Sequence, residues 1–87
     1  MGKRFTKKQI LYSHIIEARR KRAMYNRLQE RYEDKGEEER AERAFINVCE
    51  WSNKESAFIA SVTIVYGEYG CQLEQNLIEF EEKYYAN

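Results

Sequence analysis

Proline is absent from this 87-residue sequence, and glycine occurs only at Gly2, Gly36, Gly67 and Gly70. Average usage would supply roughly four prolines. Because proline is the strongest helix breaker, its absence allows long helices to run without interruption. We expect helices to end at the two interior glycine sites, which are Gly36 and the segment 67–70.

Metal ligands and long apolar runs are also scarce. The sequence holds two cysteines, Cys49 and Cys71, and one histidine, His14. A structural zinc site needs four ligands at recognisable spacing, so we expect no metal and no cofactor. No apolar stretch approaches the roughly 20 residues that span a bilayer, and the N-terminal segment has no signal-peptide core. We therefore expect a cytoplasmic protein with reduced cysteines and no membrane contact.

Catalytic motifs are missing as well. The sequence contains no glycine-rich phosphate loop, EF-hand or HExxH pattern. His14 falls on the apolar side of a predicted helix, where a core or boundary role is typical. Its neighbour Ser13 diverges from it by about 100° on that helix, so the two cannot form a base–nucleophile pair. We expect that this protein is not an enzyme.

Charge is unevenly distributed along the chain, although the net charge is zero. Residues 1–35 carry a net charge of +7, from 11 Lys/Arg and 4 Asp/Glu. Residues 36–87 carry −7, from 4 Lys/Arg and 11 Asp/Glu. Such a separation is typical of a basic binding arm, and equally of two helices that pair with each other.

The first predicted helix covers about 6–35. Thr6 is a suitable N-cap, and Gly36 suits the left-handed residue that follows a helix. On a wheel of 100° per residue, the apolar side chains fill an arc of about 180°. That arc holds Ile10, Leu11, His14, Ile15, Ala18, Tyr25, Leu28 and Tyr32. An arc of this width indicates burial against more than one neighbour.

The second predicted helix covers about 37–66, and a strand over 57–66 is its alternative. The run AFIASVTIVY is rich in β-branched and aromatic residues, which favours a strand. The sequence SNKE at 52–55 matches a capping box, which favours a fresh helix start. The apolar residues nevertheless stay within one arc of about 160° across both segments. This unbroken phase favours one long helix.

A third predicted helix covers about 71–85. Leu73, Leu77, Phe80 and Tyr84 form a narrow stripe that fits one packing seam. These elements predict an all-α domain over 1–87. We expect a long antiparallel hairpin, with the third helix folded back on it and covering about half of the hairpin's length. The basic residues 1–5 are predicted to be disordered. Dimerisation would complete a bundle over the uncovered hairpin tip.

Two charged residues fall within the predicted apolar arcs, Lys21 in the first helix and Glu55 in the second. A turn at 35–36 would bring Glu17 and Lys21 into the neighbourhood of Glu55. We hypothesise that these three residues form a polar layer. Such layers cost stability but select one alignment of paired helices, so this layer would fix the register of the hairpin.

The run RRKR at 19–22 spreads over about 300° of the helix and so cannot form a single patch. The arginines on the polar side of the first helix are Arg19, Arg20, Arg27 and Arg31. They can contact phosphates along a helix, or they can be a solvated face that balances the acidic second half. No zinc finger, RNP or KH motif accompanies them, so a nucleic-acid-binding accessory role rests on charge alone.

Four large aromatic residues are candidate interface anchors: Tyr32, Phe45, Trp51 and Phe58. Aromatic side chains are the usual hot spots of protein interfaces, and here they share a side with the expected core. In a hairpin too thin to bury everything, they can serve both roles. We expect a non-catalytic interaction module that acts as a regulator or inhibitor, either as a homodimer or by binding a protein partner.

Overall fold

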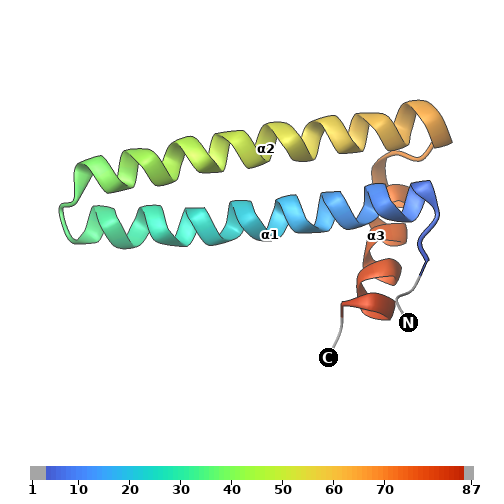
Figure 1. The fold of residues 1–87 in the computed structure, drawn as a ribbon, viewed down its shortest axis with the longest axis horizontal. Coiled ribbons are helices and arrows are strands. Elements are labelled where there is room, and N and C mark those ends of the chain that lie inside the picture. Colours follow the sequence, from blue (N-terminus) through green and yellow to red (C-terminus); the bar gives the residue numbers. More distant parts are fainter. Residues whose placement is uncertain (1–3, 86–87) are drawn as a thin grey trace.

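A computed structural model describes residues 4–85 as three helices (Figure 1). The helices are α1 (Lys7–Asp34), α2 (Glu38–Tyr66) and α3 (Gly70–Tyr84). No strand occurs within residues 4–85, so 57–66 is helix and the strand alternative is wrong. The predicted all-α hairpin with a shorter third helix is confirmed, and each predicted boundary lies within one residue of the observed one.

Local signals explain where the helices begin and end. Thr6 caps α1 in a capping box: its Oγ1 accepts from the Gln9 amide at 3.1 Å, and Gln9 Oε1 accepts from the Thr6 amide at 3.0 Å. Gly36 and Gly67 follow α1 and α2 with φ angles of 72° and 70°. Residues with a Cβ rarely adopt this left-handed conformation, so glycine stops both helices.

On the α2 side of the seam between α1 and α2, the buried residues Ala41, Glu55 and Val62 are separated by multiples of seven residues, as in a coiled coil. Ile15 and Ala18 of α1 are fully buried, and Val62 of α2 is fully buried in the same core cluster as Ile15. Towards the tip, the buried positions of α2 are Ala41 and Ala44. Small side chains let the two backbones approach closely there, but they contribute little apolar area.

The third helix runs steeply across α1 near the open end of the hairpin (Figure 1). We expected it to fold back along the hairpin, and this detail is wrong. Its stripe of Leu73, Leu77 and Phe80 is buried, as predicted, and packs with Tyr12 and Ile16 of α1. All the large buried residues therefore lie at one end of a molecule that is 44 Å long.

Aromatic rings close this core from the N-terminal side. The Phe5 ring lies 5.5 Å from that of Phe80 and 5.0 Å from that of Tyr84, both in edge-on arrangements. Residues 1–3 of the basic segment that we predicted to be disordered lie outside the described part of the chain.

The hairpin tip has no third helix over it (Figure 1). Phe45 and Ile46 are each 50% exposed there. Dimerisation over this tip stays a prediction. Between residues 4 and 85, no helix combines the length and apolarity that crossing a bilayer requires.

Replacing Ile15 with alanine tests the position of the core. Ile15 is 0% exposed, so Ile15→Ala should lower the free energy of unfolding by about 3 kcal/mol. Ile64 has the same side chain but is 82% exposed, so Ile64→Ala should change the free energy of unfolding by less than about 0.5 kcal/mol. Urea unfolding followed by circular dichroism measures both. Equal effects of the two substitutions would contradict the packing described above.

Candidate interaction face

One side of the hairpin carries two hollows that α3 does not cover, and we call this side the open face. On α1, His14 lies about 200° from Ile16, which packs under α3, so the two residues point to opposite sides. On α2, Arg40, Asn47 and Lys54 recur every seven residues and therefore share one side of the seam. The open face runs along the hairpin on the side of these residues.

The proximal hollow lies near the middle of the hairpin and has a volume of about 550 Å³. It is lined by Ser13, His14, Glu17, Trp51, Lys54 and Phe58. The His14 ring stacks on Phe58, with centroids 4.9 Å apart and planes 20° apart. Lys54 Nζ lies 4.2 Å from the centroid of the Trp51 ring, which is a cation–π contact. The hollow therefore has an aromatic floor with one cation held over it.

The distal hollow lies nearer the tip and has a volume of about 240 Å³. It is lined by Tyr25, Leu28, Tyr32, Arg40, Arg43, Ala44 and Asn47. The Arg40 guanidinium lies 5.9 Å from the Tyr32 ring centroid, which repeats the pairing of a cation with an aromatic floor. Both hollows of the open face thus combine partly exposed aromatics with positive charge.

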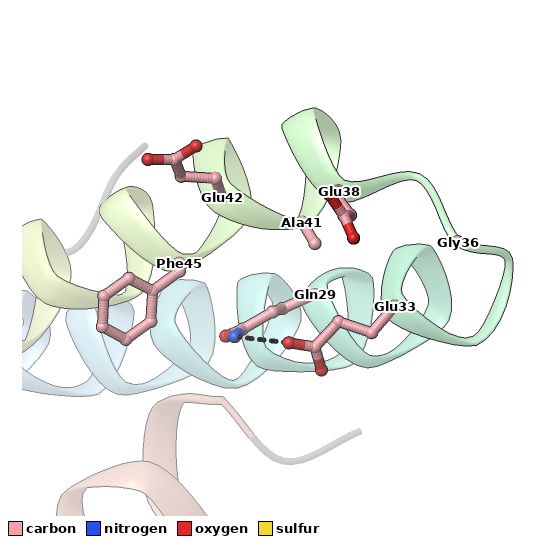
Figure 2. A pocket seen from close by; sticks show the side chains of 7 residues that line it. All are labelled: Gln29, Glu33, Gly36, Glu38, Ala41, Glu42 and Phe45. Atoms are coloured by element: carbon pink, nitrogen blue, oxygen red, sulfur yellow. Dashed lines mark hydrogen bonds between the residues drawn. The ribbon is translucent and has the colours of Figure 1, made fainter.

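The opposite side of the tip has a different character (Figure 2). Its hollow is lined by Gln29, Glu33, Gly36, Glu38, Ala41, Glu42 and Phe45. Three carboxylates line this hollow along with the ring of Phe45, and Gln29 Nε2 donates to Glu33 Oε2 at 3.2 Å. The two sides of the tip therefore carry opposite charge.

The structure separates the four predicted interface residues. Tyr32, Trp51 and Phe58 line the hollows of the open face, where they are partly exposed. Phe45 lies in the acidic hollow on the other side of the tip (Figure 2). Whether any of the four contacts a partner stays a prediction.

Arg19 joins all three helices. Its Nε donates to Glu55 Oε2 of α2 at 2.6 Å, and its two terminal nitrogens donate to the Glu74 carboxylate of α3 at 2.8 and 2.6 Å. The Glu74 carboxylate raises the pKa of Arg19, and the guanidinium lowers the pKa of Glu74. Bidentate arginine–carboxylate pairs of this kind fix geometry as well as charge.

The other predicted phosphate-binding arginines divide into two groups. Arg20 Nη2 lies 2.8 Å from Glu81 Oε2 of α3, and the Arg20 guanidinium carbon lies 4.9 Å from the centroid of the Tyr85 ring. Arg27 and Arg31 are exposed, and no ion pair of theirs occurs within residues 4–85. Two of the four arginines therefore serve internal pairing, which leaves less positive charge on α1 for phosphates.

A polar layer does form around Glu55, but its cations are Arg19 and Arg22, whereas we expected Lys21. Glu55 is only 7% exposed. Arg22 Nη1 lies 2.6 Å from Glu55 Oε1, whereas Arg19 Nε contacts Glu55 Oε2. Glu17 and Lys21 are exposed instead. The buried side of α1 is centred near Ile15, and both arginines lie within about 40° of it on the wheel, whereas Lys21 lies about 120° away. The proposed role of the layer in fixing register stays a prediction.

Glu68 is a second polar centre, and sequence reasoning did not identify it. It lies between α2 and α3, and its carboxylate accepts from Lys8 Nζ at 2.7 Å, from Asn76 Nδ2 at 2.9 Å and from the Tyr12 hydroxyl. Burial opposes ionisation of Glu68, but these donors outweigh it and hold its pKa below the ordinary value. A lone glutamate between two glycines gave no periodic signal that could have revealed this role.

The remaining reactive side chains do not gather into a site. Cys49 and Cys71 are both exposed, and His14 stacks on an aromatic ring. Across residues 4–85, no group of three or more His, Cys, Asp or Glu side chains is arranged to hold a metal ion.

Comparisons with models of protein families, with curated protein sequences and with solved structures find no match to this chain. Its function therefore has to be inferred from its own surfaces and charges.

Substituting Glu55 tests the buried ion pairs. Glu55→Gln removes the charge between Arg19 and Arg22 and should lower the free energy of unfolding by about 2 kcal/mol. The arginines remain partly exposed, so the loss should stay below that of a fully buried pair. Glu50→Gln, at an exposed position of the same helix, is the matched control and should have little effect. Equal urea midpoints for the two variants would contradict this account.

The low pKa of Glu68 predicts a dependence of stability on pH. A carboxylate with a lowered pKa in the folded state stabilises the protein fully above its unfolded value, about 4.5, and this contribution is lost as the pH falls through the folded value. Stability should therefore fall below about pH 4.5. Glu68→Gln should flatten this fall, whereas Glu82→Gln, at an exposed position of α3, should not. Thermal melts of the three proteins between pH 2 and 7 measure the difference, and parallel profiles would refute it.

Proposed function

We propose that this protein is a non-catalytic interaction module that binds a protein partner through its open face. The observation that carries the proposal is the placement of α3, which covers only one end of the hairpin. The aromatic floors of the two hollows are left partly exposed on the other side. A module of this kind acts by occupying or holding its partner, as a regulator or inhibitor does.

The chemistry of the hollows supports binding to protein. Trp, Tyr and Arg are the residue types most enriched at interface hot spots, and Trp51, Tyr32 and Arg40 line the two hollows. Hot spots lie in pockets that become fully desolvated on binding, and partly exposed aromatic floors provide such pockets. The hollows follow one another along one side of the hairpin, so a single elongated partner surface can fill both.

Binding of nucleic acid by α1 has weaker support. Arg19 and Arg20 are engaged by carboxylates of α2 and α3, and each would have to leave a partner to reach a phosphate. The aromatic floors lie on the open face, whereas Arg20 and Arg27 lie on the outer side of α1. Stacking of bases on the open face and contact of these α1 arginines with phosphates would therefore not act on the same strand.

Capture with matched variants tests the proposal. The immobilised protein should retain a partner from an extract of its source cells, and Trp51→Ala or Tyr32→Ala should reduce that retention at least tenfold. Ile46→Ala removes an equally apolar side chain outside the open face and should leave retention unchanged. Melting curves of the variants exclude loss of folding as the cause. If all three variants retain the same proteins as the unmodified chain, the open face is not the binding surface.

A further inference from the structure

The charges that line the open face are mainly positive. Lys54 borders the proximal hollow, and Arg40 and Arg43 border the distal one. Glu17 is the only acid among the residues that line the two hollows. A surface with apolar floors and cationic borders is complementary to one that carries apolar anchors flanked by carboxylates.

These cations are available to a partner. Among residues 4–85, the only carboxylate that pairs with Arg40 is Glu37, at 3.3 Å, and the only one that pairs with Arg43 is Glu39, at 3.9 Å. Exposed pairs of this kind contribute little to stability, so a partner carboxylate can replace them at small cost. Within residues 4–85, Lys54 contacts the Trp51 ring and no carboxylate.

The spacing of the hollows indicates the shape of the occupant. Lys54 and Arg43 lie eleven residues apart on α2, or about 16 Å along the helix axis. A partner helix that lies along the hairpin spans this distance if its apolar residues occur at positions i, i+3 or i+4, i+7 and i+11. Such a helix would fill the open face as a third layer.

We propose that the open face takes an acidic amphipathic helix of a protein partner. This inference rests on the proposed function and specifies the chemistry of the partner. A second copy that docks through its own open face would bring like charges together, which disfavours that arrangement. The acidic hollow around Phe45 offers a second copy an alternative, which the experiment below must exclude.

Two designed peptides of 21 residues serve as probes. Both carry leucine at the a and d positions of three heptads, with glutamate at e and g in one peptide and lysine in the other. Neither contains tryptophan, so Trp51, the single tryptophan of the chain, reports occupancy of the proximal hollow through its fluorescence. The acidic peptide should bind the full chain at least tenfold more tightly than the basic one, and this preference should shrink as salt is added.

Matched charge reversals locate the effect. Lys54→Glu should reduce the affinity for the acidic peptide about tenfold and raise that for the basic peptide. Arg27→Glu makes the same change in charge on the outer side of α1, and should leave both affinities within about twofold. Equal losses in the two variants would mean attraction by net charge alone and would overturn the proposal.

Other outcomes separate the two levels of inference. If both peptides bind equally and change the Trp51 signal, the acidic occupant is wrong and the proposed function stands. If neither peptide changes that signal, the acidic occupant is wrong. If retention in the capture experiment is also insensitive to Trp51→Ala, the proposed function falls as well. Light scattering without peptide gives the last test: self-association that both Phe45→Glu and Trp51→Ala abolish would assign the open face to a second copy.

Discussion

The shortage of cover for a long hairpin is the constraint on which the rest of this structure depends. Two helices of 28 and 29 residues present two broad sides, and within residues 4–85 one further helix, of 15 residues, covers part of one of them. Because α3 runs across α1, it concentrates the large buried residues at one end. At the tip, α2 buries only the small side chains of Ala41 and Ala44. The open face is therefore a consequence of how much apolar surface the chain has to spare.

Some of the opposite charges of the two halves of the chain pair across the helices: Lys8, Arg19, Arg20 and Arg22 of α1 contact acids of the second half. Arg19 of α1 pairs with carboxylates of both other helices. Glu68, in the short connection after α2, accepts hydrogen bonds from side chains of α1 and α3. These pairs hold a helix that has only one buried stripe, so they fix where α3 lies as well as adding stability. Some of the remaining positive charge lies on the open face, at Lys54, Arg40 and Arg43, and some lies elsewhere on α1, at Arg27 and Arg31.

Local signals made the helix boundaries predictable, but they could not show how the helices pack. Thr6 with Gln9, and the left-handed residues Gly36 and Gly67, act within a few residues of the ends that they determine. The wheel for α1 failed differently. It centred the apolar side near Tyr25 and omitted Tyr12 and Ile16. These two residues are buried because α3 crosses them. Ile10, which the wheel placed on the apolar side, is 44% exposed. A wheel drawn for one helix cannot show that a second neighbour approaches from another direction. For the same reason Lys21, rather than Arg19 or Arg22, was expected to reach Glu55. The two open hollows could not be predicted either, since they exist only because α3 leaves that side uncovered.

An exposed aromatic surface in a small protein invites self-association, and the cations of the open face limit it. A second copy of the same face meets Lys54 and Arg43 with its own Lys54 and Arg43, and like charges across an interface cost several kcal/mol. The same residues attract a surface that carries carboxylates between its apolar anchors. Positive charge beside the hollows therefore discriminates between occupants by charge, whereas the aromatic floors supply apolar area to any of them. An uncharged open face of the same shape would pair most readily with itself, so in the complex that we propose the cations are what select a foreign helix.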